Sequence, residues 1–225
     1  AAQVIDCLHA LAVRLDRRIM VRLVKGAYWD TEIKRAQVEG FDRFPVFTNK
    51  AATDVSWICC AAKLLGMTDR IYPQFATHNA HSVATVIELA QTRGIANTAF
   101  EFQRLHGMGE TLHQMVKEQN GTNCRIYAPV GAHRDLLAYL VRRLLENGAN
   151  SSFVNQIVDK DVPAETVASD PFDQLEWSGN MALCNVINPP DLYQPERINS
   201  KGWDLTNIDD LEKFDAIREP FKKVI

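Results

Sequence analysis

From its start to about residue 150 the chain alternates between two hydrophobic patterns. Short apolar runs, which are typical of buried strands, occur at residues 19–24, 70–76, 99–103 and 124–128. Between these runs apolar residues recur every three or four positions, as in a helix with one buried face. This spacing predicts helices up to residue 14 and over residues 31–38, 53–65, 81–90, 109–119 and 134–147.

The alternation of strand and helix predicts an α/β fold with a parallel sheet and helical crossovers. The last three strands recur about every 25 to 30 residues, as in a (β/α)₈ TIM-like barrel, which needs roughly 250 residues. Because only about 150 residues alternate and the chain opens in a helical pattern, we expect the C-terminal part of such a barrel, with its earlier strands before residue 1. A doubly wound sheet is the alternative, although its Gly-rich turn after the first strand is not present.

The pattern changes after residue 155. Residues 159–176 are acidic and contain two prolines, and residues 188–203 are polar, rich in turn residues and aperiodic. Such composition is typical of a connection between domains. We therefore expect one domain over residues 1–158 and a linker that leads into a second domain over residues 159–225.

Composition excludes several classes of protein. The chain has 225 residues and a net charge of −3, so no basic field favours nucleic acid. No apolar run approaches the roughly 18 residues that a membrane-spanning helix needs. The five cysteines show no paired metal spacing, and an odd number argues against a disulfide framework. Free thiols in a reducing cytosol are the interpretation that we adopt.

Every predicted strand ends in polar or special residues, at the end of the strands where the active sites of parallel barrels lie. These residues are Lys25 and Gly26, then Thr77, His78 and Asn79, then Gln103 to His106, and finally Tyr127. A glycine at such an end allows the backbone to approach a ligand closely, although it also fits a simple turn between strand and helix. Four such ends in succession predict a site.

Three histidines near these ends raise the alternative of a metal-dependent barrel hydrolase. His78 and His81 are three residues apart, and His106 follows the third strand. Histidine at strand ends can bind a metal, but no carboxylate completes the set, because Glu101 lies within its strand. We therefore assign no metal ligands.

Two adjacent arginines, Arg142 and Arg143, lie on a predicted helix that is apolar nearly all round. Such a helix is expected to be buried, and a buried arginine pair needs an anion or a carboxylate partner. Since the guanidinium fork matches a carboxylate, we favour an anion site. A surface ion pair with Glu146 is the alternative.

Five ordered stretches make the chain similar to a known family, the proline dehydrogenase domain of bacterial bifunctional proline-utilisation flavoenzymes. They are residues 22–29 (RLVKGAYW), 72–79 (YPQFATHN), 100–103 (FEFQ) with 105–108 (LHGM), 125–131 (RIYAPVG) and 139–151 (YLVRRLLENGANS). The resemblance covers residues 1 to about 158. Residues 188–193 (NPPDLY) resemble the run into the second, aldehyde dehydrogenase-type domain of that enzyme.

The resemblance implies a reaction. FAD would take a hydride from C5 of L-proline at its N5, giving 1-pyrroline-5-carboxylate, the first step of proline catabolism to glutamate. The reduced flavin would pass its electrons to a quinone. The resemblance also implies a cytoplasmic protein that associates with the membrane when reduced. In the family, a lysine and an aspartate complete the substrate pocket, and they would lie on strands before residue 1. This chain would then be inactive alone. A non-catalytic fragment remains an alternative.

The resemblance also implies site residues. Those expected around proline are Arg142 and Arg143 at its carboxylate, and Tyr28, Leu105 and Tyr127 at its ring. Those expected around FAD are Arg22, Val24, Lys25, Gly26, Ala27, Trp29, Thr48, Lys50, Thr77, His78, Asn79, Gln103, Glu146 and Ser152.

Overall fold

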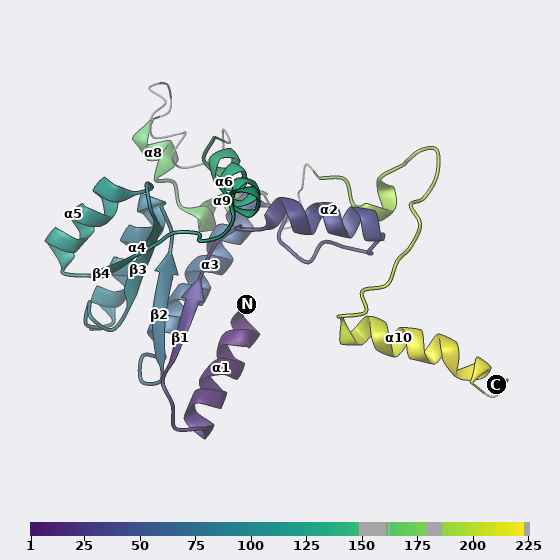
Figure 1. Ribbon diagram of the computed structural model, residues 1–225, viewed down its shortest axis with the longest axis horizontal. Helices are drawn as coiled ribbons and strands as arrows, with labels where there is room; N and C mark the ends of the chain where they lie inside the picture. Colours follow the sequence, from purple (N-terminus) through teal and green to yellow (C-terminus); the bar gives the residue numbers. More distant parts are fainter. Residues whose placement is uncertain (149–160, 162, 179–185, 223–225) are drawn as a thin grey trace. The chain divides into compact units, whose positions relative to one another are not determined.

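A sheet of four parallel strands organises the molecule (Figure 1). The computed structural model describes residues 1–148, 161, 163–178 and 186–222. The strands lie in the order β1 (Ile19–Leu23), β2 (Ile71–Ala76), β3 (Glu101–Leu105) and β4 (Asn123–Tyr127). Within the described residues the sheet is open, with β1 and β4 at its edges. The prediction of an α/β fold with a parallel sheet is confirmed.

Helices occupy every crossover that the sequence predicts. They are α1 (Ala2–Arg14), α2 (Trp29–Glu39), α3 (Lys50–Leu65), α4 (Ala80–Thr92), α5 (Glu110–Asn120) and α6 (His133–Gly148). The ends of the predicted strands and helices differ from the observed ones by at most three residues. Helical segments that were not predicted follow: α8 (Ala164–Val167), α9 (Pro171–Ser178), η1 (Pro189–Asp191), α10 (Ile208–Arg218) and η2 (Glu219–Phe221).

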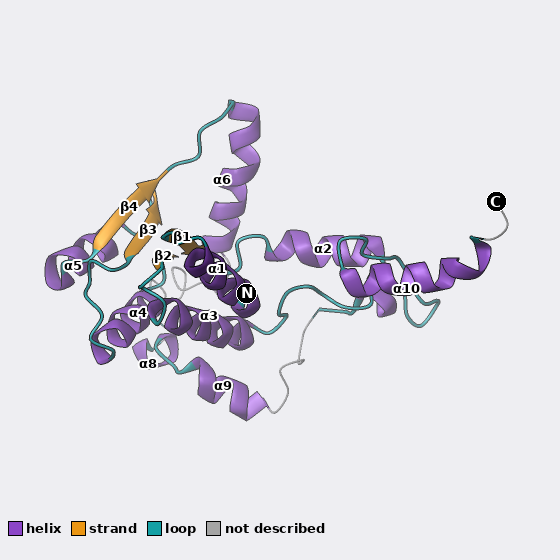
Figure 2. Ribbon diagram, turned by 90° about the horizontal axis from the view of Figure 1, so that it is seen from below, coloured by secondary structure: helices purple, strands orange, loops and turns teal. Residues whose placement is uncertain are grey.

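The hydrophobic core lies on one face of the sheet. Phe75 of β2 is fully buried and forms edge or tilted contacts with Trp57, Phe100 and Phe102 at 5.9 to 6.3 Å between ring centroids. Residues of α1, α3, α4 and α5 join this cluster, and Figure 2 shows α3 and α4 together on the same side of the sheet. Because side chains alternate along a strand, the opposite face carries a different set.

That opposite face is polar. The strand register aligns Arg22 with Gln74, Gln74 with Glu101, and Gln103 with Arg125. In β1, β2 and β3 these positions alternate with core residues, and the register sets Arg125 of β4 opposite Gln103, so all five share one face. A polar face on a parallel sheet is unusual, since such sheets are mostly apolar on both sides. This face is therefore the place where chemistry is expected.

The chain divides into two compact units. The first comprises residues 1–25 and 54–177, and the second comprises residues 26–53 and 178–225. In the second unit the tail, residues 186–222, packs against α2. Asn199 Nδ2 donates to the carbonyl of Gln37 at 3.1 Å, and the backbone N–H of Gly202 donates to the carbonyl of Gly40 at 2.8 Å. Gly40 ends α2 with φ of 67°, and a Cβ there would overlap the carbonyl oxygen of Ser200.

We expect Gly40→Ala to detach the tail from α2. The added methyl group would overlap backbone, and overpacking costs on the order of 1–3 kcal/mol. Limited trypsin digestion should cut after Lys201 roughly tenfold faster, because cleavage follows the population of the opened state. The control is Gly94→Ala, where φ is 64° but no atom lies within 4 Å of the added Cβ. Equal cleavage rates in the two variants would show that φ strain, and not the close approach, explains any effect.

Helix α6 corrects one prediction. Leu137, Leu140 and Val141 are 55%, 43% and 42% exposed, so the expectation of a buried helix is wrong for this chain. The physical reason is that no described part of the chain covers that side of the helix.

Helix α10 lies after the aperiodic residues 188–203, in a stretch for which the sequence pattern predicted no element. The Asn207 side chain caps it by accepting from the N–H of Asp209 at 3.0 Å. The positive end of the helix dipole attracts the negative charges of Asp209 and Asp210 in the first turn, which stabilises the helix. Local capping therefore replaces apolar periodicity as the cause of this helix.

Candidate active site

Three predicted residues meet on the polar face of the sheet in the first unit. Arg22 Nε donates to Gln103 Oε1 at 2.9 Å, and the Arg22 guanidinium lies 4.8 Å from the centre of the Tyr127 ring. Burial is the main cause that raises the pKa of Tyr127, and the nearby Tyr139 adds to it, so the hydroxyl stays protonated and can donate. Residues from β1, β3 and β4 thus present a cation, an amide and an aromatic ring together.

A buried carboxylate lies beneath this group. Glu101 is 4% exposed, and its Oε1 accepts from Gln74 Nε2 at 2.8 Å and from Gln103 Nε2 at 2.9 Å. Arg125 binds both carboxylate oxygens, at 2.7 and 3.0 Å. Burial acts to raise the pKa of Glu101, but the hydrogen bonds from Arg125, Gln103 and Gln74 outweigh it and hold that pKa below its ordinary value.

Helix α6 brings Arg143 close to the same group. Its charge acts on Tyr127 and on His78, and its guanidinium lies 5.6 Å from the centre of the Tyr139 ring. Arg142 is half-buried beside it. Arg143 of α6 thus lies close enough to Tyr127 and His78 for its charge to act on them, and a positive charge at this place is what an anion site requires.

The end of β2 is held by its neighbours. His78 Nε2 accepts from the backbone N–H of Leu105, which is buried, at 3.0 Å. The Asn79 side chain caps α4 by accepting from the N–H of Ser82 at 3.1 Å. The buried His113 donates through Nε2 to the carbonyl of Thr77 at 2.9 Å. These contacts fix the strand end as one rigid segment.

We expect stability to fall as the pH is lowered from 6.5 toward 4. Burial, and next the charge of His113, lower the pKa of His78 from 6.5 to about 4. The unfolded chain therefore binds a proton in this window that the folded chain does not, so stability present above pH 6.5 is lost below it. The loss should be on the order of 1–2 kcal/mol, since the half-buried ring is partly screened. Urea unfolding at pH 7 and pH 5 measures it.

The control for this pH effect is the exposed His106. His78→Asn should reduce the difference between pH 7 and pH 5, whereas His106→Asn should leave it unchanged. An unchanged difference in His78→Asn would contradict the assignment.

Lys25 at the end of β1 takes part in an ion pair. Its Nζ lies 2.7 Å from Asp54 Oδ1 and 2.9 Å from Ser82 Oγ, and 5.2 Å from the centre of the Trp57 ring. The charge expected from Lys25 is therefore largely balanced by Asp54. The ion pair ties the end of β1 to α3 and α4.

Six further expected residues lie in the second unit. Trp29 Nε1 donates to the carbonyl of Phe47 at 2.8 Å, which fixes the ring against the loop after α2. Thr48 and Lys50 flank the N-terminus of α3, where the Asn49 side chain accepts from the N–H of Ala52 at 3.3 Å. Helix N-termini attract phosphate groups.

Gly26 has φ of 67°, with no atom within 4 Å of an added Cβ. Ala27 and the exposed Tyr28 follow it.

Comparison with models of known protein families identifies the family of the chain. The family model for proline dehydrogenase matches residues 1–156. The chain belongs to the proline dehydrogenase family.

Individual relatives agree. The bifunctional protein PutA of Salmonella typhimurium is 53% identical over 215 residues, which are 91% of this chain and 16% of that protein. Proline dehydrogenase 2 of Bacillus subtilis is 37% identical over 134 residues, which are 59% of this chain and 39% of that protein. A crystal structure of a mutant of Bradyrhizobium japonicum proline utilization A is 55% identical with a TM-score of 0.85, over 95% of this chain and 22% of that one. The chain thus spans about a sixth to a fifth of the length of its bifunctional relatives.

The residues of this member of the proline dehydrogenase family fit a flavin by their chemistry. The ring system of a flavin has a polar edge that needs hydrogen-bond donors, and Arg22, Gln103 and the Tyr127 hydroxyl supply them on one face. In the second unit, considered by itself, the capped N-terminus of α3 at Lys50 suits a phosphate group. Val24, which is 39% exposed, follows β1. The side chain of Glu146 and all of Ser152 lie outside the described residues.

Metal chemistry finds no support in the described residues. No group of three or more His, Cys, Asp or Glu there could hold a metal ion. The Nε2 lone pair of His78 accepts a hydrogen bond from the backbone N–H of Leu105, so in this arrangement it does not face a metal ion. Cys7, Cys59, Cys60 and Cys124 are free thiols, and Cys184 lies outside the described residues.

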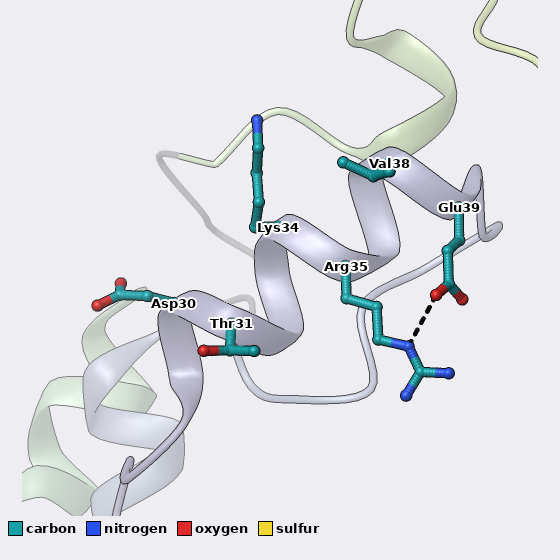
Figure 3. A pocket seen from close by; sticks show the side chains of 6 residues that line it. All are labelled: Asp30, Thr31, Lys34, Arg35, Val38 and Glu39. Atoms are coloured by element: carbon teal, nitrogen blue, oxygen red, sulfur yellow. Dashed lines mark hydrogen bonds and ion pairs between the residues drawn. The ribbon is translucent and has the colours of Figure 1, made fainter. Parts of the chain in front are cut away.

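A hollow on α2 is not an active site. Figure 3 shows six side chains that line it, from Asp30 to Glu39, and they spread along one helix without converging. Arg35 and Glu39 pair with each other at 3.0 Å.

Among the described helices none is long and apolar enough to cross a membrane.

Sequence reasoning missed several residues that the structure brings to the site. They are Gln74, Glu101, Arg125, Tyr139, His113, Asp54 and Ser82. Glu101 was set aside because it lies within a strand. The alternation of Glu101 and Gln103 with Phe100 and Phe102 could have placed both polar side chains on one face.

Proposed function

We propose that the protein carrying this chain oxidises L-proline to 1-pyrroline-5-carboxylate with FAD. The observation that carries the proposal is the meeting of Arg22, Gln103 and Tyr127 on the polar face of the sheet, with Arg143 beside them, in a proline dehydrogenase family member. Bound FAD would supply a hydride acceptor at N5 for the hydrogen on proline C5.

The chain's own residues bind and orient. Arg142 and Arg143 bind the proline carboxylate, and this contact holds C5 in place for transfer. Tyr127 and Leu105 pack around the pyrrolidine ring, together with Tyr28. No residue needs to accept a proton from carbon, since the hydrogen leaves with its electron pair. The amine gives its proton to solvent, and a C5–N double bond forms.

The remaining expected residues hold the cofactor. Arg22 and Gln103 bind the polar edge of the flavin ring, with Val24, Lys25, Gly26 and Ala27 beside it. Trp29, Thr48 and Lys50 bind the adenosine and pyrophosphate part. Thr77, His78, Asn79, Glu146 and Ser152 complete the FAD site.

We further propose a division near residue 158, with residues 159–225 as a linker and the start of an aldehyde dehydrogenase-type domain. The end of the family match at residue 156 supports it. A quinone as electron acceptor, and a cytoplasmic protein that associates with the membrane when reduced, complete the proposal.

Pyrrolidine tests the assignment of substrate, because it has the ring of proline without the carboxylate. Loss of a paired carboxylate should slow reduction of the bound flavin by at least about a hundredfold. The rates are compared by stopped-flow absorbance in the intact protein that carries this chain. Equal rates would remove the arginine pair from substrate binding and with it proline as the natural substrate.

A further inference from the structure

Two neighbours of opposite kind determine the orientation of the Gln103 amide. Arg22 can only donate, and it faces Oε1 at 2.9 Å. The ionised carboxylate of Glu101 can only accept, and it faces Nε2 at 2.9 Å. Exchanging the amide oxygen and nitrogen would set donor against donor and acceptor against acceptor. Both neighbours therefore select the same orientation.

Glu101 is itself fixed from three strands. Gln74 of β2 donates to it at 2.8 Å, and Arg125 of β4 binds it through two nitrogens at 2.7 and 3.0 Å. Among the side chains of the four described strands it is the one carboxylate. A side chain that is 4% exposed and accepts four hydrogen bonds has little freedom to move. Gln103 thus rests on a rigid anchor.

We propose that Glu101 is a positioning residue, which holds the Gln103 amide, and through it Arg22, in the orientation that meets the polar edge of the flavin. This inference rests on the proposed function and deepens it, since Glu101 acts through Gln103. A simple structural ion pair between Glu101 and Arg125 is the competing explanation. It would stabilise the sheet without any influence on the cofactor.

Glu101→Asp separates the two explanations. It keeps the charge but withdraws the carboxylate by one methylene group, so that it cannot hold Gln103 and Arg125 together. The test measures the flavin midpoint potential by dithionite titration in the intact, flavin-loaded protein that carries this chain. We expect the two-electron equilibrium to shift at least tenfold, which corresponds to about 30 mV. The matched control Glu118→Asp, at an exposed carboxylate on α5, should leave the potential unchanged.

A double-mutant cycle then asks whether Glu101 acts through Gln103. In a Gln103→Leu background the amide is gone, so Glu101→Asp should change the equilibrium less than twofold. The same shift in both backgrounds, or no shift in either, overturns the proposal. Should Glu101→Asp fail to retain flavin, Glu101→Gln takes its place in the same cycle.

Failure of this inference and failure of the proposed function give different results. The titration with dithionite needs flavin but no proline. Flavin that proline does not reduce would refute the proposed function, while the cycle would still decide the role of Glu101. Absence of flavin from the unaltered protein would refute both.

Discussion

Replacement of Arg143 by methionine should lower kcat/KM for proline by about 10²–10⁴-fold, since two charge-assisted hydrogen bonds contribute about 3–5 kcal/mol. The Arg143 guanidinium lies over the Tyr139 ring, and its charge reaches Tyr127. Methionine keeps the length and apolar stem of the side chain but cannot bind a carboxylate. The flavin content should stay the same, so the loss would lie in substrate binding and orientation.

Arg134→Met provides the matched control, because Arg134 is on the same helix and its side chain is 93% exposed. It should reduce kcat/KM less than twofold. A comparable loss in both variants would mean that the overall charge of α6, and not one bound carboxylate, explains the effect. Steady-state kinetics over a range of proline concentrations measures both.

Replacement of Phe75 by alanine should have the largest effect on stability. Phe75 is fully buried and contacts Trp57, Phe100 and Phe102. Truncating a buried phenylalanine costs about 3–5 kcal/mol, which should lower the temperature of flavin release by roughly 6–15 °C. The core lies directly behind the polar face, so the loss should loosen β2 and release the cofactor. Flavin fluorescence during heating reports the transition.

The control for the core is Phe172→Ala on α9, where the side chain is 42% exposed. It should shift flavin release by less than 2 °C, since exposed substitutions cost within about 0.5 kcal/mol. If Phe75→Ala left flavin release unchanged, β2 would not support the cofactor site.

The elements of the sheet could be predicted because their patterns are local. A strand such as residues 71–76 is a short, mostly apolar run that is buried or half-buried throughout, and α4 repeats apolar residues on one side. The hydrogen bonds of Glu101 could not be predicted, since they depend on the register that places β2, β3 and β4 side by side. Strand pairing is a long-range property that one sequence does not disclose.

For helix α6 the sequence pattern gave a wrong prediction of burial. Leu137, Leu140 and Val141 were expected to be buried, because apolar residues surround the helix. A pattern states which residues avoid water, but it does not state which part of a protein covers them. Arg142 and Arg143 lie on α6, and the charge of Arg143 acts on Tyr127, while their role at a carboxylate stays a prediction.

Proline oxidation by a bound flavin is tested most directly by an absorption spectrum of the intact protein that carries this chain, recorded without oxygen before and after addition of L-proline. We predict flavin bands that bleach when proline is added. Flavin bands that do not change would contradict proline as the substrate. A protein that contains zinc and no flavin would contradict flavin-dependent oxidation altogether.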